Sequence, residues 1–86
     1  MRPGRTGVLR SAAIALGNRP CLEGEPALVR SLDDDDPQIR AACAWALGHY
    51  GDLAQRALAN RLKIETDNAV RAEIVDALTH ATVVKE

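Results

Sequence analysis

Residues 39–49 read IRAACAWALGH, and the same pattern occurs twice more in the chain. The segment VLRSAAIALGN covers residues 8–18 and VRAEIVDALTH covers residues 70–80, so the spacing is 31 residues both times. Within each copy, aligned apolar residues recur at positions i, i+4, i+7 and i+8, which is the spacing of one face of an α-helix. Three copies at a fixed period predict a repeat architecture built from similar helices.

A second type of helix is expected between these copies. Residues 25–32 read EPALVRSL and residues 55–62 read QRALANRL, each with Leu at i and i+4 and Ala before the first Leu. We name the three copies B helices and these two segments A helices. The sequence therefore predicts a single all-α domain over residues 1–86, a short right-handed α-solenoid with five helices in the order B-A-B-A-B. The expected helices cover approximately residues 6–17, 24–33, 37–49, 52–63 and 68–80.

Capping residues support these boundaries. Asp36 precedes Pro37, which is the order of an N-cap followed by proline at the first helical position. Asp67 occupies the matching place before the last B helix. Positive backbone φ angles are expected where the first two B helices end, because tolerant residues gather there: Gly17, Asn18, Gly48 and Gly51.

Composition and charge limit the function classes. The chain has 86 residues, of which 47% are hydrophobic, and it contains no Phe. Ala and Leu dominate this fraction, as is typical of closely packed helices. Eleven Lys and Arg stand against 12 Asp and Glu, giving a formal net charge of −1. No global basic field is present, so nucleic-acid binding would require a local patch.

The two cysteines indicate the compartment. Cys21 and Cys43 do not form a CxxC motif, and no signal-peptide pattern precedes them. This usage favours a reduced, cytoplasmic setting over a disulfide framework. No apolar run approaches the roughly 20 residues of a membrane-spanning helix, so no membrane partner is expected.

The first B helix is expected to have an uncovered apolar face. Residues 1–7, MRPGRTG, are too few and too rich in Gly and Pro to form an A helix in front of it. Another copy of the chain, or a domain from which this chain derives, would then cover the face. The expected partner-facing residues of this helix are Val8, Ala12, Ala15 and Leu16.

Trp45 is the single tryptophan of the chain and is a further candidate partner-facing residue. Packing between repeats, beside Ile14 at the equivalent position, is the preferred interpretation. Stacking on a nucleic-acid base is the alternative.

No catalytic, cofactor-binding or metal-ligating constellation is present in the sequence. The run Asp33–Asp36 lacks the alternating spacing and the Gly of a calcium loop, so a turn with an N-cap is preferred over a cation site. One of its carboxylates is expected to pair with Arg40 and Arg71, which occupy the same repeat position. These two arginines are predicted to be structural, holding adjacent turns by charge-assisted hydrogen bonds.

Two local basic areas exist despite the negative total charge. One lies near the start of the chain, and the other lies in and after the second A helix. A solvated surface explains both, and phosphate contacts are the alternative. The candidate nucleic-acid contacts are Arg10, Arg19, Arg56, Arg61 and Lys63.

The repeat motif also resembles a known family. Asp36-Pro37 followed by Ile39-Arg40, and Asp67 followed by Val70-Arg71, resemble the D-P and I/V-R steps of HEAT-like repeats. More specifically, RSAAIALGN (10–18), EPALVRSLDDDDPQIRAACAWALG (25–48) and VRAEIVDAL (70–78) resemble the C-terminal HEAT-like region of epoxyqueuosine reductase. This similarity covers most of the chain, roughly residues 8–80.

The resemblance implies a function linked to tRNA. The resembled enzyme reduces epoxyqueuosine in tRNA with cobalamin and iron–sulfur clusters, and its helical C-terminal region helps to hold the tRNA anticodon stem-loop. The cluster motifs and the cobalamin domain are absent from this sequence, so the resemblance implies a non-catalytic, tRNA-holding module without a cofactor of its own. A free-standing module that binds a protein partner, or a second copy through the uncovered first helix, is the alternative.

Overall fold

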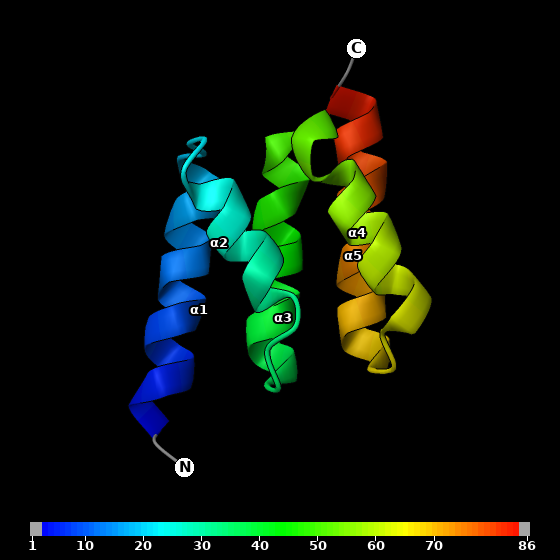
Figure 1. Ribbon diagram of the computed structural model, residues 1–86. Coiled ribbons are helices and arrows are strands. Elements are labelled where there is room, and N and C mark those ends of the chain that lie inside the picture. The colour runs from blue at the N-terminus through cyan, green and yellow to red at the C-terminus, as the bar shows by residue number, and fades with distance from the viewer. Residues whose placement is uncertain (1–2, 85–86) are drawn as a thin grey trace.

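The computed structural model describes the backbone of residues 3–84 and the side chains of residues 7–52 and 54–79. This part of the chain is helical and contains no strand, which confirms the all-α prediction (Figure 1). The elements are α1 (Pro3–Asn18), α2 (Gly24–Ser31), α3 (Pro37–Leu47), the short 3-10 helix η1 (Gly48–Tyr50), α4 (Asp52–Ile64) and α5 (Asn68–Val84).

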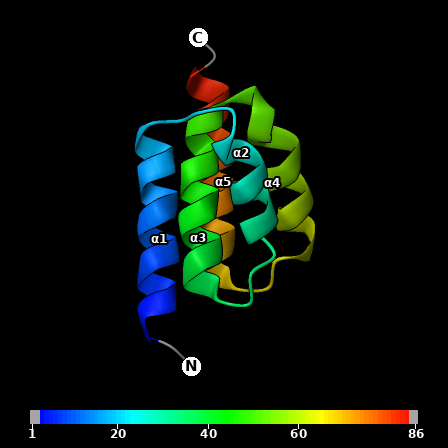
Figure 2. The same cartoon turned by 60° about the vertical axis from the view of Figure 1, so that its left-hand side comes forward.

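The helices form two layers. The B helices α1, α3 and α5 lie side by side in chain order, and the A helices α2 and α4 lie on one side of that layer (Figure 2). The helix α2 packs on α3, and α4 packs on α5. The molecule is accordingly flat, with extents of 42 × 27 × 16 Å. This arrangement confirms the predicted solenoid of alternating helices.

Both predicted aspartate caps are present. The Asp36 side chain accepts a hydrogen bond from the backbone amide of Gln38 at 2.9 Å, with Pro37 in the first turn of α3. Asp67 accepts hydrogen bonds from the amides of Ala69 and Val70 at 2.9 and 3.1 Å. Each carboxylate satisfies amides that would otherwise have no partner at the start of a B helix.

Several helix boundaries differ from the expected ones. The first B helix begins at Pro3, ahead of the expected residue 6, and the last extends to Val84. Proline tolerates the first turn of a helix because its missing N–H has no partner there in any case, so the Pro and Gly of the opening segment do not prevent helix formation. The first A helix ends at Ser31, and the middle B helix tightens into η1 at Gly48.

The expectation for Gly17 and Gly48 is wrong. Among the described residues, only Gly51 has a positive φ, at 64°. Gly17 lies within α1 and Gly48 begins η1, and both permit two B helices to approach closely. A Cβ on Gly17 would lie 2.5 Å from Cζ3 of Trp45, and one on Gly48 would lie 3.0 Å from Cβ of Ala77.

The core explains why α3 carries only apolar side chains after Arg40. Ile39 and Leu47 are 1% and 0% exposed, and Ala44 is 0% exposed on another side of the same helix. The A layer covers the first two, while α1 and α5 flank α3 within the B layer. A helix that is hydrophobic all round is stable when it is buried from several sides.

A buried carboxylate links adjacent repeats. Glu65, in the loop before α5, accepts two hydrogen bonds from the Arg40 guanidinium and one from Arg61, each at 3.0 Å. Arg61 also forms an ion pair with Asp33 at 2.9 Å. These contacts join residues of successive helical hairpins, so they fix the repeats relative to each other.

The two repeat arginines also bind backbone carbonyls, of which those of Asp34 and Glu65 occupy the same repeat position. Arg40 donates to the carbonyl oxygens of Asp34 and Asp35 at 2.8 and 3.1 Å, and Arg71 donates to those of Leu62 and Glu65 at 2.9 and 3.0 Å. The expected link between Arg40 and the acidic run thus includes its backbone carbonyls. The sequence analysis did not anticipate Glu65 as a carboxylate partner of Arg40.

Candidate binding surfaces on the first helix and around Trp45

The first B helix leaves exposed the face that the other two bury. Val8, Ile39 and Val70 occupy the same repeat position, and they are 67%, 1% and 0% exposed. The helix α1 therefore has the apolar residues that an A helix covers in the other two repeats. The described part of the chain contains no A helix over them.

The neighbouring positions of the repeat show the same contrast. Ala12 is exposed, although its equivalents Cys43 and Ile74 are 2% and 0% exposed. Ala15 is exposed as well. Leu16 differs from the expectation because it is half-buried and packs against the core.

The open face has a second wall, which α2 provides. Glu25, Val29 and Asp33 of α2 and its C-terminal turn line the groove towards α4, while Leu28 points into the core. Helical geometry then places Ala27, Arg30 and Ser31 on the side of α2 that faces away from α4. We name the space between these two walls the open slot; its other wall is formed by Val8, Ala12 and Leu16 of α1, with Arg19 directly after the helix.

The described helices leave the open slot unoccupied. The helix α2 lies alongside α3, and α1 forms the edge of the B layer (Figures 1 and 2). Leu22, in the loop between α1 and α2, is 76% exposed and adds apolar surface at one end of the slot. The sequence analysis did not single out Leu22 or Arg30, because only the fold brings α2 beside α1.

A groove on the other side of the B layer surrounds Trp45. It has a volume of about 440 Å³ and is lined by residues of all three B helices, including Arg10 and Ile14 of α1 and Glu73 of α5. The Trp45 ring lies beside Gly17 and is tilted by 55° against His49 at 4.6 Å between ring centroids. Trp45 thus packs between repeats and also lines an open groove.

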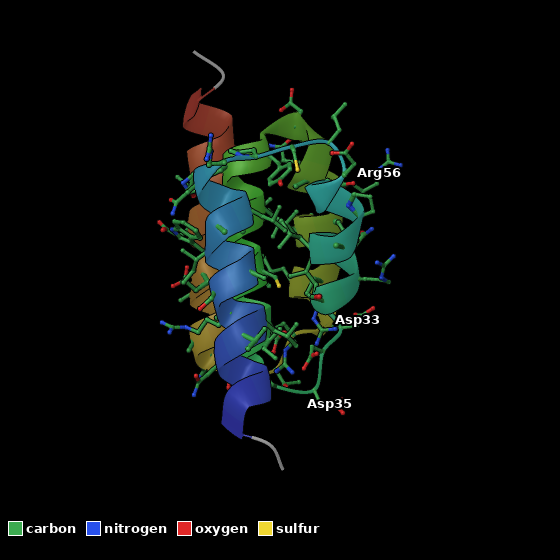
Figure 3. All side chains as sticks on the ribbon, turned by 90° about the vertical axis from the view of Figure 1, so that its left-hand side faces the viewer. Asp33, Asp35 and Arg56 are labelled. Carbon is green, nitrogen blue, oxygen red and sulfur yellow. The ribbon has the colours of Figure 1, made fainter. Side chains whose placement is uncertain are left out.

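The candidate nucleic-acid contacts lie in separate places. Arg10 lines the Trp45 groove, and Arg19 follows α1. Arg56 and Lys63 are exposed on α4 in the A layer, and Figure 3 labels Arg56 there. Arg61 is half-buried and bound to carboxylates, so its guanidinium is already engaged. The fold does not gather the five residues into one basic surface.

Comparison with known proteins gives the family. A model of HEAT repeats matches residues 4–79. The chain belongs to the HEAT repeat family. An uncharacterized protein encoded in the gldA 3' region of Geobacillus stearothermophilus is 34% identical over 77 residues, which is 87% of this chain and 36% of the relative. The HEAT domain described here therefore spans little more than a third of that relative, and no solved structure matches it.

The comparisons support the HEAT-like part of the sequence analysis. They do not link the HEAT domain to epoxyqueuosine reductase, so the resemblance to that enzyme, with its tRNA partner, stays a prediction.

Among the ionisable groups whose pKa is clearly shifted, Cys43 is a buried residue of the core. Burial raises the pKa of the Cys43 thiol from 9.0 to about 11, although a hydrogen bond with Ser31 acts in the opposite direction. A thiol with a raised pKa is a poor nucleophile at neutral pH, so Cys43 acts as a small buried residue. Within the described residues, no group of three or more His, Cys, Asp or Glu side chains is arranged to hold a metal ion.

Among the helices described for the HEAT domain, none combines the length and apolar character needed to cross a membrane.

Proposed function

We propose that this HEAT domain is a non-catalytic binding module that docks an α-helix of a partner protein in the open slot. The observation that carries the proposal is the exposure of Val8 at 67%, where the equivalent Ile39 and Val70 are at most 1% exposed. The same apolar position serves as an interface in two repeats, whereas no described residue covers it in the first.

The occupant follows from the interfaces inside the molecule. An A helix covers this face of α3, and another covers this face of α5. In both A helices a leucine points into the core: Leu28 is 3% exposed and Leu58 is 0% exposed. A helix with the same stripe of Ala and Leu continues the packing, and burying an aliphatic side chain such as Val8 contributes about 1.5–3 kcal/mol.

A second copy is a less suitable occupant. Both described A helices of a copy already cover its own α3 and α5, so neither is available without unfolding its own repeat. The A helices of a second copy are therefore not the occupant that we propose, and the proposal assigns the slot to a helix of a partner protein.

Titration of helix-stabilised peptides tests the proposal. Two fluorescently labelled peptides would copy residues 22–35, which contain α2, and residues 52–65, which contain α4. We expect at least one to bind the wild-type chain in an anisotropy titration, and Val8→Glu to weaken binding at least tenfold, because it places a charge in the apolar slot.

The control is Val75→Glu, a charge at a 50% exposed valine on the outer face of α5, which is expected to leave peptide binding unchanged. Circular dichroism would verify that both variants keep their helices. Absence of binding by both peptides would contradict the proposal, and so would binding that is insensitive to Val8→Glu. Dimerisation through Val8, seen by sedimentation, would assign the slot to a second copy instead.

Binding of a tRNA anticodon stem-loop is the second candidate function, as the reductase resemblance implies. The exposed cations Arg56 and Lys63 on one face of α4 favour it. In the same assay, a labelled stem-loop would bind in a salt-sensitive way and would be released by the double variant Arg56→Ala/Lys63→Ala. Arg61 is retained in this variant because its loss would break the contacts to Glu65 and Asp33.

A further inference from the structure

We propose that a hollow on the face of the B layer opposite the A helices binds an arginine side chain of a partner protein. The hollow lies between α3 and α5, next to the Trp45 groove, and its use is independent of the open slot. A half-buried indole lines it together with two carboxylates that have no ion-pair partner among the described residues.

Small residues form the floor of this hollow, which has a volume of about 400 Å³. Gly48 and Ala77 are both buried, and they let α5 approach the end of α3 while filling little of the space above them. The Trp45 indole lines the α3 side, and Glu73 and Asp76, about one turn apart on α5, line the other side. We name this space the acidic hollow.

The repeat register brings the indole and the carboxylates together. Ile14, Trp45 and Asp76 occupy the same repeat position on the three B helices, so they form a row across the layer. Glu73 occupies the position that Ala42 has in α3. A polar surface is expected on a terminal helix. Glu73, however, is half-buried and lines both the acidic hollow and the Trp45 groove, so exposure to water alone does not explain a carboxylate at this place.

The described cations around these carboxylates have other positions or partners. Neither Glu73 nor Asp76 forms an ion pair among the described side chains. Arg10 lines the Trp45 groove together with Glu73, but α3 lies between their two helices. Arg71 donates to two backbone carbonyls of α4 and its following loop, and His49 packs its ring against the indole. Like charges one turn apart repel each other, so a cation between Glu73 and Asp76 removes an unfavourable interaction.

An arginine guanidinium complements this combination of groups. Its flat face stacks on tryptophan, while its N–H groups bind carboxylates in a bidentate way. A lysine ammonium has no flat face and is more strongly hydrated, so we expect it to bind more weakly. The same carboxylates repel phosphate, which makes a nucleic-acid base a less suitable partner for Trp45.

An NMR titration tests the proposal, because the single tryptophan gives one indole N–H resonance in the isotope-labelled protein. The probe is the capped peptide Gly-Leu-Arg-Leu-Gly, compared with the same peptide carrying lysine or citrulline in place of arginine. Citrulline has the shape of arginine without its charge. We expect the arginine peptide to shift the resonance saturably and the citrulline peptide to bind at least about fivefold more weakly, since it loses the cation–π and ion-pair contacts.

Two double variants separate the acidic hollow from the total charge of the molecule. Glu73→Gln/Asp76→Asn should weaken binding of the arginine peptide at least about fivefold, because both carboxylates are lost. The control Glu23→Gln/Asp35→Asn removes the same charge at two exposed residues, one on each side of α2 in the chain, and Figure 3 labels Asp35. It should change the affinity by less than about twofold, because distant exposed charges are screened. Circular dichroism would verify that both variants keep their helices.

Equal affinities for the arginine and citrulline peptides would overturn the proposal, and so would equal losses in the two double variants. An indole resonance that responds to the tRNA anticodon stem-loop and not to the arginine peptide would also overturn it, by assigning Trp45 to base stacking. Loss of the arginine response in Val8→Glu would place the peptide in the open slot instead. A response that survives Val8→Glu and is weakened in Glu73→Gln/Asp76→Asn would establish the acidic hollow as a separate site.

Discussion

Glu65 is a buried carboxylate on which the charged contacts between repeats converge. Its side chain is 0% exposed and binds both Arg40 and Arg61. Burial by itself raises the pKa of this carboxyl, but hydrogen bonds from Arg40, the Asp67 amide and Arg61 outweigh it and lower the pKa from 4.5 to about 2. A group with a lowered pKa stabilises the fold above its unfolded-state pKa. We therefore expect this contribution to be complete above about pH 5 and to be lost towards pH 2.

The substitution Glu65→Gln tests this contribution. It keeps the shape but removes the shared negative charge from Arg40 and Arg61, of which Arg61 retains Asp33, so we expect the free energy of unfolding at pH 7 to fall by about 2–4 kcal/mol. Urea denaturation followed by circular dichroism at pH 7 and pH 3 measures the effect. Wild type should lose more stability than the variant between these pH values, and equal losses would show that Glu65 does not titrate as described.

At the scale of the element, close approach of B helices depends on glycine. Ala in place of Gly normally stabilises a helix interior, and we expect Gly7→Ala to add about 0.5–1 kcal/mol because nothing lies within 4 Å of its added Cβ. Gly17→Ala in the same helix should instead cost about 1–3 kcal/mol, because its Cβ would meet the Trp45 ring at 2.5 Å and Cα of Ala46 at 3.0 Å.

Thermal unfolding of both variants, together with the fluorescence of the single tryptophan, checks this pair. A shifted emission maximum in Gly17→Ala alone would accompany displacement of the ring. Stabilisation by both substitutions would contradict the close approach of α1 and α3.

The elements were largely predictable from the sequence because one signal recurs. The 31-residue period identified the B helices, and the lack of an A-helix pattern in residues 1–7 indicated the uncovered face around Val8. Asp36 and Asp67 were recognisable as caps because N-capping is a local property of the chain.

Other features depend on neighbours distant in sequence. A glycine near the end of a helix gives the same sequence signal whether it serves a positive φ or a close crossing, and only the contact with Trp45 distinguishes the two for Gly17. Glu65 lies in a loop and gains its role from the two arginines around it. Arg30 became part of the candidate site because α2 lies beside α1.

At the scale of the whole molecule, covering α1 should stabilise the entire stack. A variant in which a second copy of residues 22–36 replaces residues 1–5 places an A helix directly ahead of Thr6, with the connection that α2 has to α3. We expect its melting temperature to rise by about 5 °C or more, since about 1 kcal/mol shifts a domain of this size by roughly 4–8 °C.

Calorimetry of this variant and of the same fusion carrying Val8→Glu provides the measurement and its control. The increase should be largely absent from the control. An equal melting temperature in the fusion and the wild-type chain would show that α1 gains nothing from a cover of this type.

The two outer B helices present different surfaces. Ala13 and Gly17 of α1 meet α3, and the equivalent Ala44 and Gly48 meet α5. The next member of this series is Val75 with Thr79, both exposed on α5. In the terms of polymer chemistry, α1 resembles an active chain end and α5 a terminated one. A further repeat can pack next to α1 in the existing register. One that packed next to α5 would first require smaller residues in place of Val75 and Thr79.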